Sequence, residues 1–133
     1  MVVLENTSLC VIVKDEIMNP AGGILDFVDS TVPFVEEAVI VDTGSTDGTR
    51  EMLEECRIKY KHLKVCDRPF DNYASSRNFS LAHATKKWSL ILDADERLVE
   101  TDFVTLAKEQ EMYGWEVGGY NLTVYDVYPS GAI

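Results

Sequence analysis

The chain has 133 residues, 46% of them hydrophobic and 26% charged, which excludes an intrinsically disordered protein and is sufficient for one domain with a hydrophobic core. Twelve lysines and arginines stand against 23 aspartates and glutamates, so the formal net charge is −11. Nucleic acids and anionic membrane surfaces attract proteins that carry a positive field, so neither is an expected partner of this acidic chain.

The sequence shows neither a membrane span nor an export signal. Its apolar runs are far shorter than the ~20 residues of a transmembrane helix. The N-terminus lacks the basic and then apolar pattern of a signal peptide. Three cysteines, Cys10, Cys56 and Cys66, are too few and too scattered for a disulfide framework or a metal site, and we interpret them as core residues. These features predict a cytoplasmic protein.

In the first half of the chain, short apolar runs alternate with segments in which apolar residues follow helical spacing. Residues 8–13 form an apolar run that predicts a strand buried on both faces. Residues 24–28 then have helical spacing, and Pro33 should close that segment. Residues 38–41 predict a second buried strand, and residues 47–60 predict a helix with one apolar face.

The same alternation continues in the second half. The strands expected here are short apolar or Tyr- and Val-rich runs, and they cover residues 63–66, 88–92 and 119–127. A helix is expected over residues 74–84, with Asn72 as its N-cap. Thr101 should cap a further helix that continues to about residue 112. Elements in this order predict an α/β domain with a mainly parallel sheet and flanking helices.

Acidic residues follow three of the predicted strands. Asp15 and Glu16 come after the first strand, Asp42 after the second, and Asp93 and Asp95 after the fourth. An acidic residue at a strand end also serves ordinary turns. However, ligands of open α/β sheets bind outside the carboxyl ends of the strands, and three such ends together favour a binding site.

The triplet Asp93-Ala94-Asp95 places two carboxylates one residue apart, directly after an apolar strand. Mg2+ and Mn2+ prefer oxygen ligands and take only a few of them from the protein, the others coming from water and phosphate. Such a cation would neutralise a diphosphate that an acidic protein otherwise repels. The triplet therefore predicts a divalent metal site.

Residues 41–49 predict a strand end, a tight turn and the start of a helix. Two glycines allow the turn, and Ser45, Thr46 and Asp47 can cap the helix. The segment has neither the P-loop nor the dinucleotide pattern. We expect that the turn does not need Asp42, whose carboxylate is then free to bind a base or a sugar. Arg77, one turn into the third helix, can either pair with surface acid or bind phosphate.

Four motifs of this chain, in order, resemble those of the family 2 glycosyltransferases with the GT-A fold. They are Lys-Asp-Glu at residues 14–16, the Val-Asp-Thr-Gly-Ser-Thr-Asp-Gly-Thr segment at 41–49, Ser-x-Arg-Asn-Phe at 75–79 and Leu-Asp-Ala-Asp-Glu at 92–96. The resemblance covers residues 8–98. It implies a GT-A type, Rossmann-like sheet that binds a nucleotide-sugar donor, in the first place a UDP-sugar.

The resemblance also implies roles for individual residues. The backbone of Val13 would meet the base, with Glu16 nearby, and Asp42 would bond the base. Arg77 would lie near the base or the diphosphate.

For the other end of the donor, the resemblance implies that Asp93 reaches the ribose or the sugar and that Asp95, together with Asp93, holds Mn2+ or Mg2+. The implied reaction transfers the sugar to a hydroxyl acceptor with inversion, and the metal acts as a Lewis acid on the leaving diphosphate.

The family places its catalytic base and acceptor site well beyond the Asp-x-Asp motif, whereas this chain has 38 residues after Asp95. We therefore expect residues 1–133 to form a single donor-binding domain that is truncated after a fifth strand and lacks the acceptor half. Its catalytic base and its acceptor stay unassigned. A second copy of the chain or the missing half would cover exposed apolar surface.

Two alternatives remain open at this point. A phosphoacceptor receiver domain has a similar length, but its acceptor aspartate should follow the acidic pair by about forty residues, and Asp93 lies 77 beyond Glu16. The other alternative is a non-catalytic nucleotide-sugar-binding or interaction module that has kept the fold with a degenerate site.

Overall fold

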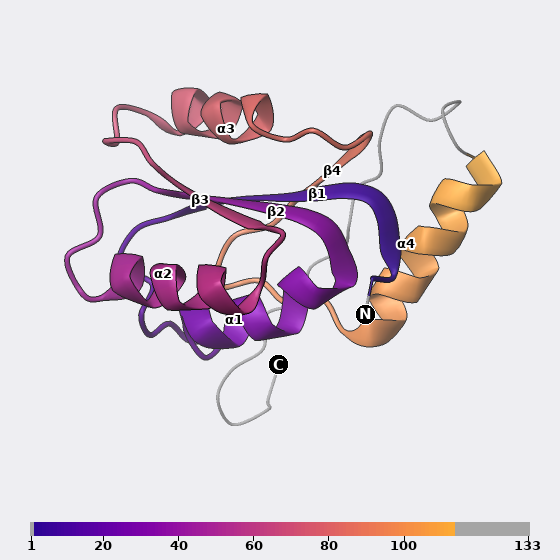
Figure 1. Ribbon diagram of the computed structural model, residues 1–133, viewed down its shortest axis with the longest axis horizontal. Coiled ribbons are helices and arrows are strands. Elements are labelled where there is room, and N and C mark those ends of the chain that lie inside the picture. Colours follow the sequence, from indigo (N-terminus) through magenta and orange to yellow (C-terminus); the bar gives the residue numbers. More distant parts are fainter. Residues whose placement is uncertain (1, 114–133) are drawn as a thin grey trace.

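Four parallel strands form the central sheet of the computed structural model, which describes residues 2–113 (Figure 1). The strands are β1 (Leu4–Val13), β2 (Val35–Asp42), β3 (Leu63–Asp67) and β4 (Trp88–Ile91). Their order across the sheet is β3-β2-β1-β4, so β1 pairs with β2 on one side and with β4 on the other. This order excludes a receiver domain, in which the first strand lies between the second and the third.

Helices cover both faces of the sheet, as Figure 1 shows. On one face lie α1 (Ile24–Thr31) and α2 (Thr49–Lys59), and a short 3₁₀ helix, η1 (Val32–Phe34), connects α1 to β2. On the opposite face lies α3 (Tyr73–Ala82). A fourth helix, α4 (Glu100–Tyr113), lies beside the amino-terminal part of β1, where Gln110 donates a hydrogen bond to Thr7.

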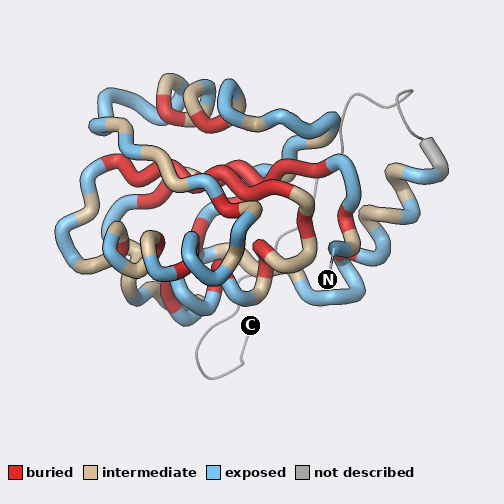
Figure 2. The backbone as a smooth tube through the Cα atoms, in the orientation of Figure 1, coloured by how far each residue is buried: buried red, intermediate tan, exposed pale blue. Residues whose placement is uncertain are grey.

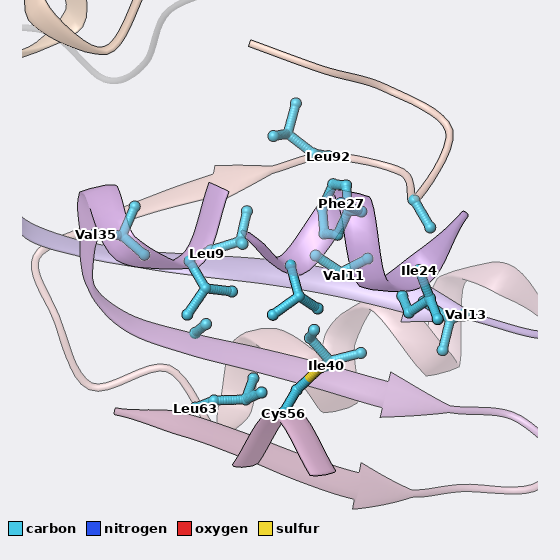
Figure 3. Packing of buried hydrophobic residues seen from close by; sticks show 14 of the residues in the cluster. Leu9, Val11, Val13, Ile24, Phe27, Val35, Ile40, Cys56, Leu63 and Leu92 are labelled. Carbon is cyan, nitrogen blue, oxygen red and sulfur yellow. The ribbon is translucent and has the colours of Figure 1, made fainter. Parts of the chain in front are cut away.

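The hydrophobic core lies between the sheet and the α1–α2 layer (Figures 2 and 3). Alternate residues of β1, among them Leu9 and Val11, point into it because successive side chains of a strand face opposite sides. Phe27 of α1 packs there with no exposed surface. The face that α3 covers is closed by small side chains instead, since Ser76 and Ser80 are fully buried. Small residues let α3 approach the sheet closely.

The first two strands begin earlier than the sequence predicts. Leu4 of β1 already pairs with Val35 of β2, and the pairing is irregular between Leu4 and Ser8. Within this irregular part, Asn6 has a positive φ of 54°, and its backbone N–H donates to the Glu36 carboxylate at 2.7 Å. Polar residues in this stretch interrupt the apolar run, which explains why the prediction began at Ser8.

Helix ends agree with the predictions in part. The Asn72 side chain accepts the backbone N–H of Ser75 at 2.8 Å, which confirms Asn72 as the N-cap of α3. The expectation that Thr101 caps α4 is wrong, because the helix already begins at Glu100 and the Asp102 carboxylate accepts the N–H of Val99. The strand predicted over residues 119–127 lies outside the described residues.

Glu37 is a buried carboxylate near the start of β2, at the end of the sheet opposite the predicted site. One oxygen accepts hydrogen bonds from the Ser8 hydroxyl (2.6 Å) and the Thr85 N–H (2.8 Å), and the other from Lys64 Nζ (2.7 Å) and the Thr85 hydroxyl (2.8 Å). Burial opposes ionisation, but these hydrogen bonds, led by that of Lys64, lower the pKa of Glu37 to about 2. Glu37 thereby ties β1, β2, β3 and the segment before β4 together.

Candidate functional site

A pocket of about 370 Å³ lies at the carboxyl ends of β1 and β4. The strand order reverses direction between these two strands, and in open α/β sheets ligands bind in the crevice at that point. The predicted site residues that line the pocket are Val13, Glu16, Arg77, Asp93 and Asp95. Asp42 is not among the lining residues, but its neighbour Thr43 is. The structure therefore brings together side chains that are up to 82 residues apart in the sequence.

The two carboxylates of the Asp-x-Asp triplet are held outward by the residue between them. Ala94 is 2% exposed and belongs to the core cluster, whereas Asp93 and Asp95 on either side are exposed. Ala94 and Asp95 lie in a turn in which the Glu96 N–H donates to the Asp93 carbonyl at 2.9 Å, and this turn buries the small residue while leaving both carboxylates in solvent. The Asp93 N–H donates to the Glu96 carboxylate at 2.8 Å, which holds the turn.

A third carboxylate, that of Glu16, shares the negative potential of the pair. Burial raises the pKa of Glu16, the hydrogen bond from Asn19 opposes this rise, and the charges of Asp95 and Asp93 raise it further. Within residues 2–113, no three acidic, His or Cys side chains are arranged as a complete metal site. Two carboxylates nevertheless fit Mg2+ or Mn2+, which take one or two protein carboxylates and fill the remaining positions with phosphate and water.

Arg77 forms the basic wall of the pocket. Its Nη2 lies 3.6 Å from the Asp93 carboxylate, whereas its Nη1 is buried and has no hydrogen-bond partner. The guanidinium thus pairs with an exposed carboxylate, which is one of the two sequence interpretations of Arg77, and phosphate binding stays a prediction. A buried donor without a partner costs about 1–3 kcal/mol.

The two carboxylate oxygens of Asp42, at the end of β2, differ in their surroundings. Its Oδ1 accepts the backbone N–H groups of Gly44 and Ser45, both at 2.9 Å. The expectation that the turn does not need Asp42 is therefore wrong, because this aspartate closes the turn in the way that Asx turns do. Its Oδ2 is buried and has no hydrogen-bond partner in the described part of the chain.

The backbone of Val13 is already hydrogen-bonded to Thr43. Its carbonyl oxygen accepts both the N–H and the hydroxyl of Thr43, each at 3.0 Å. These two hydrogen bonds use both lone pairs of the carbonyl. The Val13 side chain is 2% exposed and packs in the core cluster, and the neighbouring Lys14 also lines the pocket.

The loop after β2 is bound to the loop after β1. Ser45 and Thr46 do not cap α2, because the Ser45 hydroxyl accepts the Asp15 N–H (2.9 Å) and the Thr46 N–H donates to the Asp15 carboxylate (2.7 Å). Asp47 does serve the helix, since its Oδ1 accepts the N–H of Thr49, the first residue of α2. The two loops thus hold each other in place beside the pocket.

Asn19 is a residue that the sequence interpretation missed. Its side-chain N–H groups donate to the Glu16 carboxylate (2.9 Å) and to the Ala94 carbonyl (3.1 Å), while its oxygen accepts the N–H groups of Ala21 and Gly23. It therefore joins the loop after β1 to the Asp-x-Asp turn. The Asn-Pro and Gly-Gly pairs predict a loop here, but they do not reveal the partners of the amide.

Arg97 was also missed, and it holds the same two loops together. Its guanidinium donates to the carbonyls of Ala94 (2.7 Å), Ala21 (3.2 Å) and Gly23 (3.1 Å), and it pairs with the Asp26 carboxylate at 3.0 Å. Gly23 has φ +101°, and a Cβ there would lie 2.4 Å from the Ile17 carbonyl, so glycine is required. The turn that carries the Asp93 and Asp95 carboxylates is thus fixed by hydrogen bonds to the loop after β1.

The profile of the family described as glycosyl transferase family 2 matches residues 8–114. The chain therefore belongs to this family, as its motifs predict. It is 34% identical over 101 residues to the lipopolysaccharide core biosynthesis glycosyltransferase LpsC of Rhizobium meliloti, a match covering 68% of this chain and 37% of LpsC. It is 35% identical over 96 residues to a TPR repeat-containing protein of Synechococcus elongatus, a match covering 72% of this chain and 22% of that protein.

Solved structures confirm the predicted GT-A fold. The mannosyltransferase PcManGT from Pyrobaculum calidifontis, in complex with GDP-Man and Mn2+, is similar with a TM-score of 0.66 at 24% identity, over 82% of this chain and 32% of that chain. Residues 1–349 of S. aureus TarS, in complex with UDP, are similar with a TM-score of 0.64 at 21% identity, over 88% of this chain and 38% of that chain. This chain thus spans well under half the length of these relatives. Among residues 2–113, no helix has the length and apolarity needed to cross a membrane.

Proposed function

We propose that this chain is the donor-binding part of a glycosyltransferase and that its pocket holds a nucleoside-diphosphate sugar, in the first place a UDP-sugar, together with Mn2+ or Mg2+. The observation that carries the proposal is the meeting of Arg77, with an unused buried donor, and the Asp93–Asp95 carboxylates in one pocket at the strand-order reversal. The GDP-Man and Mn2+ of PcManGT and the UDP of TarS support it.

In this proposal, different residues bind different parts of the donor. Asp42, whose Oδ2 has no partner, accepts a hydrogen bond from the base or the ribose, and the Arg77 guanidinium, which lines the pocket, donates to the diphosphate. Asp95 holds the cation, with Asp93 beside it. Glu16 adds negative charge next to the pair, which favours a cation further.

Transfer of the sugar to a hydroxyl, with inversion at the anomeric carbon, is the reaction that the family resemblance implies, and the pocket would serve the donor side of it. The cation, when bound, supplies Lewis-acid stabilisation of the leaving diphosphate. Arg77 adds a fixed positive charge where negative charge develops on that diphosphate. None of residues 2–113 is assigned as the base that deprotonates the acceptor, so the proposal for the chain itself is donor binding.

Titration calorimetry of the chain with UDP in the presence of Mn2+ tests the donor site. Binding should weaken at least tenfold when a chelator replaces Mn2+ and in Asp95→Asn, which keeps the shape of the side chain and removes its charge. Glu55→Gln removes the same charge from the exposed side of α2 and should bind UDP like the unaltered chain. Binding of UDP that is indifferent to Mn2+ and to Asp95→Asn would contradict the metal site. No binding of UDP at all would favour a degenerate, non-catalytic module.

A further inference from the structure

Two aromatic side chains stand exposed at the rim of the pocket. Phe70 is 45% exposed and Tyr73 is 76% exposed, and both line the pocket. Their ring centroids are 5.0 Å apart and their planes meet at 72°, an edge-to-face pair. Neither ring belongs to the hydrophobic core cluster of the described residues. Large apolar surface left in water next to a polar pocket is a feature that a ligand with a flat apolar face would cover.

The Phe70–Tyr73 pair lies along the same wall of the pocket as the charged groups of Arg77 and Asp93. Asn72 caps α3, so Tyr73 is its first residue, and Arg77 follows at i+4 on the same side of the helix. Across the pocket, the Asp93 carboxylate lies 3.6 Å from the Arg77 guanidinium. The wall of the pocket therefore runs from aromatic rings through a guanidinium to a pair of carboxylates.

This sequence of groups is complementary to one class of ligand. A nucleoside diphosphate has a planar base at one end and a charged diphosphate, with its cation, at the other. Residues 12–14 at the end of β1, which face the same pocket, are aliphatic or basic and supply no aromatic ring. Among the residues that line the pocket, Phe70 and Tyr73 are thus the aromatic ones, whose rings can stack on a base.

We propose that Phe70 and Tyr73 form the base subsite, one ring stacking on the nucleobase of the donor and the other contacting its edge, while Arg77 and the Asp93–Asp95 turn hold the diphosphate end. This inference rests on the proposed donor-binding function. Every nucleobase has a π-face, so stacking demands a base without selecting which one. The pair therefore favours nucleotides over diphosphates that lack a base.

The test compares two probes on the whole chain in the presence of Mn2+, UDP and inorganic pyrophosphate, which lacks the base. Removing a stacking ring weakens base binding by roughly ten- to a hundredfold. Phe70→Ala and Tyr73→Ala should therefore each weaken UDP binding about tenfold and leave pyrophosphate binding unchanged. Tyr73→Phe keeps the ring and should bind UDP normally. Ile58→Ala removes an apolar side chain that is 71% exposed on α2, and serves as the matched control.

The outcomes separate this inference from the proposed function. Unchanged UDP affinity in both alanine variants overturns the base subsite and leaves the donor site standing. Equal losses for UDP and pyrophosphate also overturn it, because the rings would then act only on the shape of the pocket. If the unaltered chain binds neither probe, the proposed function fails and the subsite fails with it. Circular dichroism melting of each variant shows whether the fold is retained.

Discussion

Replacing Glu37 by Gln tests how the amino-terminal end of the sheet is held together. All four hydrogen bonds to this carboxylate come from donors: the Ser8 hydroxyl, Lys64 Nζ, and the N–H and hydroxyl of Thr85. Gln has nearly the same shape but one acceptor oxygen, so its NH₂ group would face two of these donors. The substitution thus removes the charge and leaves buried donors without partners.

The size of the effect follows from the pKa of Glu37. Its folded value of about 2 lies below the ordinary 4.5, so ionised Glu37 stabilises the fold above pH 4.5, and this contribution is lost as the pH falls towards 2. The lowered pKa corresponds to roughly 3 kcal/mol at pH 7 and roughly 1.5 kcal/mol at pH 3. Glu37→Gln should therefore lower the free energy of unfolding by about 3 kcal/mol at pH 7, or the melting temperature by roughly 10 °C.

Urea unfolding followed by circular dichroism at pH 7 and pH 3 measures this difference. The gap between the unaltered chain and Glu37→Gln should shrink by about half at pH 3. Glu55→Gln, on the exposed side of α2, should stay within about 0.5 kcal/mol of the unaltered chain at both pH values. A Glu37→Gln variant within about 1 kcal/mol at pH 7, or a gap that does not change with pH, would refute this reasoning.

Further substitutions at four positions test other parts of the structure. Gly44→Ala should lower the free energy of unfolding by roughly 1–2 kcal/mol because of the positive φ at this position alone. Gly23→Ala should lower it at least twice as much, because the added Cβ would also collide with the Ile17 carbonyl. Equal losses in urea unfolding would contradict this close approach. Arg97→Ala should weaken UDP binding in the presence of Mn2+ about tenfold. Arg97→Lys should restore only part of the affinity, because a lysine lacks the planar guanidinium with its several N–H donors. An unchanged affinity in calorimetry would argue against a positioning role of Arg97. Phe27→Ala should cost roughly 3–5 kcal/mol, measured in the same unfolding assay, and a smaller loss would mean that the core collapses around the gap.

The features predictable from sequence were those that depend on neighbouring residues. Apolar runs place the four strands of the described sheet, because a strand buried on both faces has few polar residues. The Asn72 cap is a local hydrogen bond between residues three apart, and it was predicted correctly. The prediction that acidic strand ends meet needed only the geometry of parallel sheets, which brings all carboxyl ends to one edge.

The features that were missed depend on contacts between distant segments. Arg97 reaches carbonyls more than seventy residues away in the sequence, and no residue type identifies a backbone carbonyl as a partner. The diversion of Ser45 from the α2 cap to Asp15 has the same origin. Asp42 was misjudged for a different reason, because the sequence does not show that one of its oxygens closes the turn by accepting the backbone N–H groups of Gly44 and Ser45.

Arg97 and Asn19 join the loop after β1 to the Asp-x-Asp turn, and these hydrogen bonds limit how the two segments can diverge among relatives. Both side chains donate to main-chain carbonyl oxygens of the opposite loop, which every residue type possesses. Position 21 can therefore change its side chain without disturbing the contact. Inserting or deleting a single residue between Asn19 and Gly23, by contrast, would shift those atoms out of reach. Over evolutionary time, loop length should be preserved here more strictly than loop composition.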